Sequence, residues 1–452
     1  MIERVPGNGD SSPAFQYGDF DLDPRTRTLV CTYAVGDRRF EERIVIDSGS
    51  ARNDGVEEAA RLVFLLVGVS YYKAFAPPVI DLGDTAVVAS LGPFLAEYYR
   101  EGLGEFAYQN ELDLRATSFV GGREVPRHDG KDGVGAVERP LVPFGGGLDS
   151  LVTVDIVRRA TPDAALFVVS RAGDRFDAIE TPAAETGLPV LRASRELDPA
   201  ILRSRELGFL NGHVPVTGIL SAIAVLVAVM NDRDAVVMSN EWSASAGNVE
   251  FDGVLVNHQY SKSLAFERSF RAVLRDLSPA FPDYFSLLRP RSELWIAREF
   301  ARHPRHLQTF RSCNRAFHID PAQRLDHWCG VCDKCAFIDL ILSPFVEREV
   351  LGRIFRGNEP LENPDLLAVF ETLAGLGQGA KPFECVGDVD ECRAAIVLAG
   401  KRADRQGSAV LAALGEQIRA SSAEPALDVE HLFSPIGEHF ISEPYASDLR
   451  LA

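Results

Sequence analysis

Three consecutive glycines stand before a carboxylate and a hydroxyl in the stretch LVPFGGGLDSLV, which begins at residue 141. A short apolar run precedes the glycines, and a helix-like pattern follows them. Glycines let backbone N–H groups approach an anion without a Cβ in the way, and a helix N-terminus adds unpaired donors and partial positive charge. The phosphates of a nucleotide are therefore predicted to bind at Gly145, Gly146, Gly147, Asp149 and Ser150.

This glycine run differs from two common nucleotide-binding patterns. A Walker A loop needs a lysine before its Ser or Thr, a dinucleotide turn needs GxGxxG, and neither is present at this point. The run instead resembles the SGGxDS motif of the PP-loop ATP pyrophosphatases, which split ATP between its α and β phosphates and adenylate a substrate. Gly145 stands where that motif has serine, so one hydroxyl donor is missing. An ordinary glycine-rich turn between a strand and a helix is the alternative.

Cysteines form a second group that could do chemistry. Cys329, Cys332 and Cys335 share a C-x2-C-x2-C spacing, and Cys313 precedes them by 15 intervening residues. Four thiolates suit a tetrahedral structural Zn²⁺, which is our prediction. An iron–sulfur cluster uses the same ligands, and reduced cysteines packed as small apolar residues are the third alternative. A similar arrangement occurs late in the chain of the PP-loop 7-cyano-7-deazaguanine synthases. The other three cysteines lack such spacing: Cys31, Cys385 and Cys392.

Polar side chains follow the apolar run AVVM, in the stretch SNEWSASAGN that begins at residue 239. If AVVM is a parallel strand, this stretch lies at its carboxyl end, where ligands bind in open α/β sheets. Substrate contacts are predicted for Asn240, Glu241 and Asn248. A polar loop without a ligand is the alternative.

Groups able to move protons are dense in VNHQYSKS, which begins at residue 256. His258, Lys262 and Tyr260 are our candidates for proton transfer, chosen by residue type. The next candidates come from residues 289–315, which hold seven arginines in an otherwise acidic chain. Guanidinium groups suit phosphate and carboxylate, so Arg289 and Arg291 are predicted to bind an anionic substrate. A solvated helix face with salt bridges is the alternative.

The elements that must position these residues alternate between strands and helices from Pro140 onward, which favours βαβ units and a parallel sheet. We therefore predict an α/β fold with three parts. Residues 1–130 form an N-terminal α+β domain, residues 136–260 a parallel-sheet PP-loop nucleotide-binding core, and residues 261–452 a mainly helical region with the four-cysteine metal site.

Composition narrows the range of partners. The net charge of −18 over 452 residues argues against a nucleic-acid partner, which needs clustered Lys and Arg. The N-terminus carries no signal-peptide pattern. The most apolar segment, residues 214–230, is shorter than the roughly 20 residues of a membrane span, and we expect a buried helix. These patterns predict a cytoplasmic protein without a membrane contact, and they indicate no particular oligomeric state.

Seven stretches taken together resemble one family, the ATP-dependent UDP-N-acetylmuramoyl-L-alanyl-L-glutamate epimerases of bacterial cell-wall synthesis. They are GVSYYKAF, PFGGGLDS, SNEWSASAGN, VNHQYSKS, SCNRAF, WCGVCDKC and KPFECVG. The resemblance implies a small-molecule substrate, a UDP-sugar dipeptide whose terminal L-Glu becomes D-Glu. It implies ATP and Mg²⁺ as well, with Asp149 helping to position the ion, and an acyl-adenylate intermediate that yields AMP and pyrophosphate.

Other functions remain open at this stage. Another PP-loop adenylating enzyme, such as a 7-cyano-7-deazaguanine synthase-like protein or an amide-forming ligase, would use the same loop and add nitrogen to its product. A tRNA-thiolating enzyme would need a basic surface, which the composition disfavours. A regulatory protein that binds nucleotide without cleaving it is the alternative outside the enzymes, and Gly145 in place of serine gives it some support.

Overall fold

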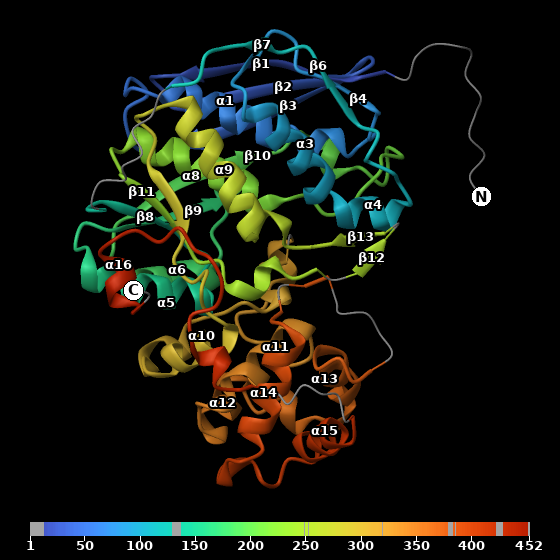
Figure 1. Ribbon diagram of the computed structural model, residues 1–452, viewed down its shortest axis with the longest axis vertical. Coiled ribbons are helices and arrows are strands. Elements are labelled where there is room, and N and C mark those ends of the chain that lie inside the picture. Colours follow the sequence, from blue (N-terminus) through green and yellow to red (C-terminus); the bar gives the residue numbers. More distant parts are fainter. Residues whose placement is uncertain are drawn as a thin grey trace.

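The computed structural model describes residues 13–128, 137–247, 249–251, 253–318, 320–377, 383–384, 386–421 and 428–450. Within these ranges the chain has an upper α/β part, built on one large sheet, and a narrower lower part made of helices (Figure 1). The sheet has ten strands in the order β14-β11-β8-β9-β10-β3-β2-β1-β4-β6. Both parallel and antiparallel neighbours occur in it, so the sheet is mixed.

Two β-rich runs separated by turn residues, FDLDPRTRTLVCTYAVG and RRFEERIVID, predict a hairpin-like arrangement near the N-terminus. The structure has an antiparallel meander there, as the first element of the described residues. Its strands are β1 (Phe15–Asp23), β2 (Thr28–Val35) and β3 (Arg38–Ile46). Side chains of β3 alternate between exposed and buried, so one face of the meander packs on a core. The short strands β4 (Val79–Asp81) and β6 (Ser118–Val120) extend this edge in parallel with β1 and β4 respectively.

The sequence predicts one helix over residues 55–75, and over residues 92–112 a helical stretch that breaks at its glycines. The first stretch gives α1 (Val56–Val67) and α2 (Val69–Tyr72), separated by Gly68. The second gives α3 (Leu91–Gly102) and α4 (Gly104–Asn110). The glycine- and charge-rich sequence of residues 121–140 predicts a linker or loop. This range contains the two-residue strand β7 (Arg123–Glu124), which pairs with β5 (Ala86–Val87), and residues 129–136 lie outside the described residues.

Five neighbouring strands form the parallel portion that the alternating pattern predicts. They are β8 (Pro140–Pro143), β9 (Ala165–Ser170), β10 (Val190–Glu196), β11 (Ala235–Met238) and β14 (Asp283–Ser286). The parallel sheet does not stand alone, because β10 pairs antiparallel with β3 through contacts such as Ala193 with Ile46. One sheet thus takes strands from the predicted N-terminal range, from the predicted nucleotide-binding range and, with β14, from the range expected to be mainly helical.

Helices cover both faces of this parallel portion. Leu166 and Val168 of β9 face one core with α5 (Leu148–Ala160) and α6 (Asp177–Thr186). Ala165 and Phe167 face the other core, with α1, α8 (Val216–Met230) and α9 (Leu264–Leu277). The apolar segment of residues 214–230 is therefore a buried helix, as expected. Within the described parts of the chain, none of the helices has the length and apolar character that a membrane crossing needs.

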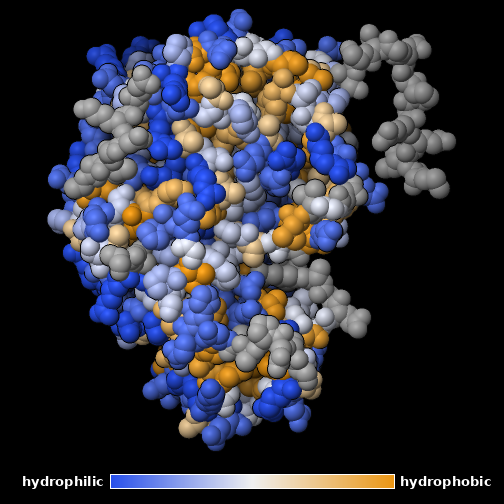
Figure 2. Space-filling model, in the orientation of Figure 1, coloured by the Kyte–Doolittle hydropathy of each residue, from blue (hydrophilic) through white to orange (hydrophobic). Residues whose placement is uncertain are grey.

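The helices of the lower part share one hydrophobic core with α5 of the upper part (Figure 1). Its main helices are α10 (Glu293–Ala301), α11 (Asp333–Leu342), α12 (Arg348–Ile354), α13 (Leu367–Leu373), α14 (Val389–Ala399) and α15 (Ala409–Ala420). The chain then returns to the upper part, where α16 (Tyr445–Asp448) lies against α5 through a hydrogen bond between Tyr445 and Thr161. Figure 2, in the orientation of Figure 1, shows a surface with many hydrophilic side chains, on which apolar side chains gather near the top and again in the lower part.

Candidate active site

The strand order reverses beside β8. From β8 the chain moves through β9 to β10 on one side, and it then crosses back to β11 and β14 on the other side. The carboxyl ends of β8 and β11 therefore border the crevice where ligands bind in open α/β sheets. The glycine run follows β8 and Asn240 follows β11, so the topology brings two sequence-predicted groups to this crevice.

The glycine loop is shaped by one residue in particular. Gly146 has φ +74°, and a Cβ there would lie 2.2 Å from the carbonyl oxygen of Ala178, so only glycine fits. Gly145, by contrast, has nothing within 4 Å of its Cβ position, so the serine of the SGGxDS motif would fit at this point. Gly147 caps α5 with an extended backbone, and the hydroxyl of Ser150 donates to its carbonyl oxygen at 3.0 Å.

Three carboxylates meet beside this loop, each from the carboxyl end of a different parallel strand. Asp149 follows β8, Glu241 follows β11 and Glu293 follows β14, and one oxygen of each lies within 4.8 Å of the others. Glu241 and Glu293 are buried. Burial raises the pKa of Glu293 well above its usual value, and the negative charges of Asp149 and Glu241 raise it further. Carboxylate oxygens are the ligands that Mg²⁺ prefers, and a divalent cation would relieve the repulsion among them.

A fourth carboxylate joins the helical part to this cluster. Glu391, in the first turn of α14, accepts hydrogen bonds from the backbone N–H of Glu293 at 2.8 Å and of Asp388 at 2.6 Å. Burial raises the pKa of Glu391 to about 7. Lys334 of α11 contributes the positive charge that opposes the raised pKa of Glu293. Residues of the lower part therefore help to form the crevice.

The predicted substrate-binding residues are packed against protein groups. The amide of Asn240 donates to the hydroxyl of Ser286 at 3.0 Å. Arg291 is buried over the ring of Trp295, and burial lowers its pKa to about 10. Asn248 lies outside the described residues. Substrate binding by these side chains stays a prediction.

Arg289 is also buried, and it connects three segments. Its guanidinium forms an ion pair with Glu267 at 3.0 Å and donates to the carbonyl oxygens of Glu241, at 2.7 Å, and of Lys262. The segment that supplies Glu241 is therefore held at a fixed position relative to the segment that supplies Lys262. Arg289 thus joins these segments in the structure, and substrate binding by Arg289 stays a prediction.

His258 belongs to a cluster that the sequence did not indicate. Its Nδ1 forms a hydrogen bond with Oε2 of Glu105 on α4, and Nδ1 of His213 lies 3.8 Å from the same oxygen. The two imidazole rings have centroids 4.3 Å apart. Lys73 is nearby, with Nζ donating to Asn211 at 2.9 Å and to the carbonyl oxygen of Gly212 at 3.0 Å.

The other two proton-transfer candidates lie on η2 (Tyr260–Lys262). Nζ of Lys262 donates to Oε1 of Gln259 at 3.1 Å. Tyr260 is buried, and burial together with the charge of Glu97 raises the pKa of its hydroxyl. This hydroxyl therefore stays protonated near neutral pH, where it can donate a hydrogen bond and cannot serve as a base.

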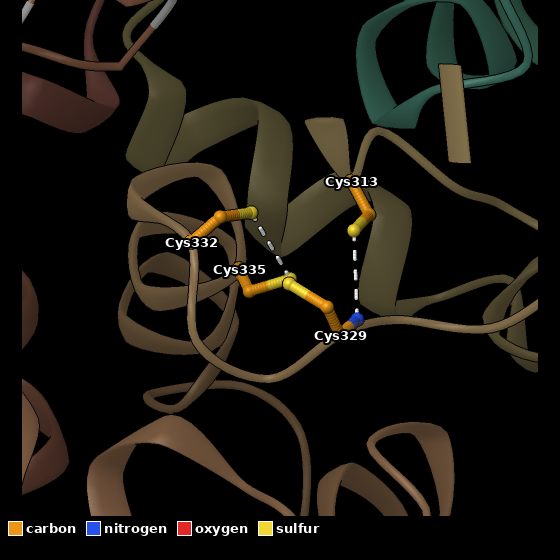
Figure 3. Close-up of side chains that lie close together, drawn as sticks. All are labelled: Cys313, Cys329, Cys332 and Cys335. Atoms are coloured by element: carbon orange, nitrogen blue, oxygen red, sulfur yellow. Dashed lines mark hydrogen bonds between the residues drawn. The ribbon is translucent and has the colours of Figure 1, made fainter. Parts of the chain in front are cut away.

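The four predicted metal-binding cysteines come together, with their sulfurs within 4.8 Å of one another (Figure 3). Sγ of Cys335 lies 3.5 Å from that of Cys332 and 3.6 Å from that of Cys329. A Zn–S bond of about 2.3 Å gives sulfurs roughly 3.8 Å apart in a tetrahedron, so the spacing fits one Zn²⁺. An iron–sulfur cluster would separate the cysteine sulfurs further, because several metal atoms lie between them. Of the remaining cysteines, Cys31 and Cys392 are buried in the two cores and Cys385 lies outside the described residues.

The cysteine cluster also supports the glycine loop. The backbone N–H of Arg311, two residues before Cys313, donates to the carbonyl oxygen of Gly146 at 3.3 Å. On the other side, Cys335 follows Lys334 at the start of α11. A metal ion bound by the four sulfurs would hold both segments against the crevice.

Sequence reasoning missed several residues of the site. Glu293 and Glu391 lie in stretches read for their arginines or their helical pattern. Lys73 lies in GVSYYKAF, one of the stretches that carry the family resemblance, so a signal for it was present. Glu105 and His213 lie more than 100 residues apart in segments without a motif, and only the fold brings them to His258.

Comparisons with known proteins match both parts of the chain. The MurL N-terminal domain matches residues 8–287, and the MurL C-terminal domain matches residues 309–429. A protein of Xanthomonas oryzae pv. oryzae, named UDP-N-acetyl-alpha-D-muramoyl-L-alanyl-L-glutamate epimerase, is 38% identical over 94% of each chain. Proteins of the same name from Salinispora tropica and a Micromonospora species are 38% and 36% identical over 96% of this chain and over 95% and 97% of their own lengths. No solved structure matches this chain.

Proposed function

The chain belongs to the MurL family of epimerases, and we propose that it inverts the terminal L-Glu of UDP-N-acetylmuramoyl-L-alanyl-L-glutamate in an ATP-dependent reaction of peptidoglycan precursor synthesis. The products are the D-Glu epimer, AMP and pyrophosphate. The glycine loop beside three carboxylates, at the strand-order reversal, is the observation that carries the ATP-dependent part of this proposal.

The chemistry explains why an epimerase would consume ATP. Inversion begins with loss of the α-proton, and the adjacent α-carboxylate opposes a second negative charge on the same group. Attack of that carboxylate on the α-phosphorus of ATP gives an acyl-adenylate and releases pyrophosphate. The acyl group can then accept the electron pair of the broken C–H bond as an enolate. Proton return to the other face followed by hydrolysis gives the D-epimer.

The glycine loop would bind the phosphates of ATP. Gly146 keeps the loop close to α6, and the backbone N–H groups that open α5 are available donors for oxygens of the nucleotide. Asp149, Glu241 and Glu293 would hold Mg²⁺, which when bound neutralises negative charge on the leaving pyrophosphate. Gly145 leaves space where the related motif has serine, so the backbone carries the contact that a hydroxyl would otherwise share.

A structural Zn²⁺ on the four cysteines is part of the proposal. The four sulfurs fit one tetrahedral ion, and no chemical step requires it. Its contribution would be to hold Arg311 and Lys334 beside the crevice. His258, Lys262 and Tyr260 remain the candidates for proton transfer.

One incubation tests the proposed function. The protein is mixed with ATP, Mg²⁺ and UDP-N-acetylmuramoyl-L-alanyl-L-glutamate in D₂O, and products are analysed by mass spectrometry and chiral analysis of the released glutamate. We expect AMP, pyrophosphate, deuterium at the glutamyl α-carbon and D-Glu. ATP cleavage without deuterium would instead indicate a ligase or synthase, and no ATP cleavage would indicate a regulatory nucleotide-binding protein.

A further inference from the structure

Four segments that are distant in the sequence converge on one small group of ionisable side chains. Lys73 follows α2, Glu105 lies on α4, His213 lies in the loop before α8, and His258 lies between β13 (Val254–Val256) and η2. The loop before α8 is fixed from two sides. Lys73 donates to it, and Asn110 of α4 donates to the carbonyl oxygen of Asn211 at 3.1 Å. The arrangement is therefore built from several elements and does not depend on one mobile loop.

Glu105 holds the imidazole of His258 at its carboxylate, and the imidazole of His213 lies beside it. Its Oε2 contacts Nδ1 of His258 and lies 3.8 Å from Nδ1 of His213, while its Oε1 accepts a hydrogen bond from Gln109 at 2.7 Å. A carboxylate at Nδ1 fixes the tautomer of an imidazole, because the proton stays on Nδ1 and the basic lone pair is on Nε2. It also stabilises the imidazolium that forms when Nε2 accepts a proton.

The surroundings suit a developing anion. Burial lowers the pKa of His213 to about 4, and the charges of His258, Lys73 and Lys262 act in the same direction against the opposing effect of Glu105. His213 is therefore neutral near pH 7 and can donate a hydrogen bond without losing a proton. The two lysines give the cluster a positive potential, which favours an enolate oxygen and disfavours a divalent metal ion at the same three ligands.

The cluster is connected to the proposed adenylation site through buried contacts. Arg289 donates to the carbonyl oxygens of both Glu241 and Lys262, and Asn257 donates to the carbonyl oxygen of Ala244 at 3.0 Å. Glu241 belongs to the carboxylate cluster, and Lys262 follows His258 by four residues. These contacts connect the carboxylate cluster, which would activate the substrate carboxylate, to the His258 cluster, which would act on the adjacent α-carbon.

We propose that Glu105, His213 and His258 form the proton-transfer site of the epimerisation, with His258 as the base, Glu105 as its positioning residue and His213 as a hydrogen-bond donor to the enolate oxygen. This inference rests on the proposed function. Nε2 of His258 takes the α-proton of the acyl-adenylate, and the electron pair of the C–H bond moves onto the acyl oxygen, where His213 donates. The imidazolium is then stabilised by Glu105.

The proton that returns to the opposite face comes from outside this cluster. The two rings are too close together, at 4.3 Å between centroids, to hold the α-carbon between them. The returning proton originates in solvent, so the D-epimer formed in D₂O carries deuterium. His258 then releases the first proton to solvent, so the proton taken from one face and the proton delivered to the other balance over the cycle and the base is regenerated.

Two partial reactions separate this inference from the proposed function. Substrate-dependent exchange of labelled pyrophosphate into ATP reports adenylation, and deuterium at the glutamyl α-carbon reports proton transfer. In Glu105→Gln we expect the deuteration rate to fall about 10²- to 10⁴-fold, with pyrophosphate exchange within about threefold of wild type because the adenylation groups are untouched. Glu101→Gln, the same change four residues earlier, is the matched control and should retain both reactions.

A second pair of variants distinguishes loss of the catalytic base from misfolding of the site. His258→Ala should lose deuteration and regain part of it when imidazole is added, whereas added imidazole cannot repair a misfolded site. His431→Gln, a change at an exposed histidine, is the control for histidine substitution. Absence of pyrophosphate exchange in wild type would contradict the proposed function itself. Normal exchange with wild-type deuteration in Glu105→Gln would overturn the inference, as would a second bound zinc ion that this variant loses.

Discussion

Replacing Gly146 by alanine tests the glycine loop most sharply. The residue has φ +74°, a conformation that costs an L-residue roughly 1–2 kcal/mol. The added Cβ would also lie 2.2 Å from the carbonyl oxygen of Ala178, where a backbone shift is required. Such overpacking costs about 1–3 kcal/mol. Together, these two contributions predict a destabilisation of the loop by about 3 kcal/mol. If that energy is lost from nucleotide binding, the affinity for ATP falls roughly 100-fold.

The neighbouring glycine supplies a matched control for this change. Gly145 has nothing within 4 Å of its Cβ position, so Gly145→Ser should keep nucleotide affinity within about threefold of wild type. ATP affinity is measured by calorimetry, adenylation by pyrophosphate exchange, and folding by thermal melting of both variants. If Gly146→Ala binds and turns over ATP as wild type does, at an unchanged melting temperature, the loop does not bind the phosphates in the way we describe.

Three further predictions concern the ions and the pH dependence. Glu293→Gln should raise the Mg²⁺ concentration needed for half-maximal pyrophosphate exchange at least about tenfold. In the presence of chelator the same variant should melt at a higher temperature, because the repulsion among the buried carboxylates is relieved. An unchanged Mg²⁺ requirement would argue against Glu293 as a ligand. Cys329→Ser should lose one equivalent of zinc by elemental analysis and melt at a lower temperature, and a wild-type protein without zinc would contradict the site. The free energy of unfolding should fall by up to roughly 3 kcal/mol as pH drops from about 6.5 to about 4. The reason is that His213 binds a proton in the unfolded state, whereas its lowered pKa prevents this in the folded state. Urea titrations of His213→Gln over the same pH range should show a smaller fall.

Local elements could be predicted from the sequence because each depends on a short pattern. The run of small and apolar residues from Val216 to Met230 predicts a buried helix. Gly68 marks the end of α1, and Gly104 marks the start of α4. The strand, glycine loop and helix around Gly146 follow from turn chemistry alone. The pairing of β3 with β10 could not be predicted, since strand order depends on contacts between residues about 150 positions apart.

In the candidate site as well, residues in a local motif could be predicted from the sequence, and residues brought together by long-range contacts could not. The four cysteines were found because zinc ligation imposes a spacing on the sequence. Glu293 could not be found in this way, because β14 is only four residues long and lies in the range expected to be mainly helical. The position of β14 beside β11 is what brings that carboxylate to Asp149. Glu105 and His213 carry no motif, and their role depends entirely on tertiary contacts with His258.

Transfer of an oxygen atom tests the central claim, activation of the substrate carboxylate by ATP, most directly. Substrate labelled with ¹⁸O in the glutamyl α-carboxylate is turned over with ATP and Mg²⁺ in ordinary water, and the AMP formed is analysed by mass spectrometry. An acyl-adenylate hydrolysed at its acyl carbon leaves one labelled oxygen on the phosphate of each AMP. Unlabelled AMP, accompanied by an inverted glutamate, would contradict the account.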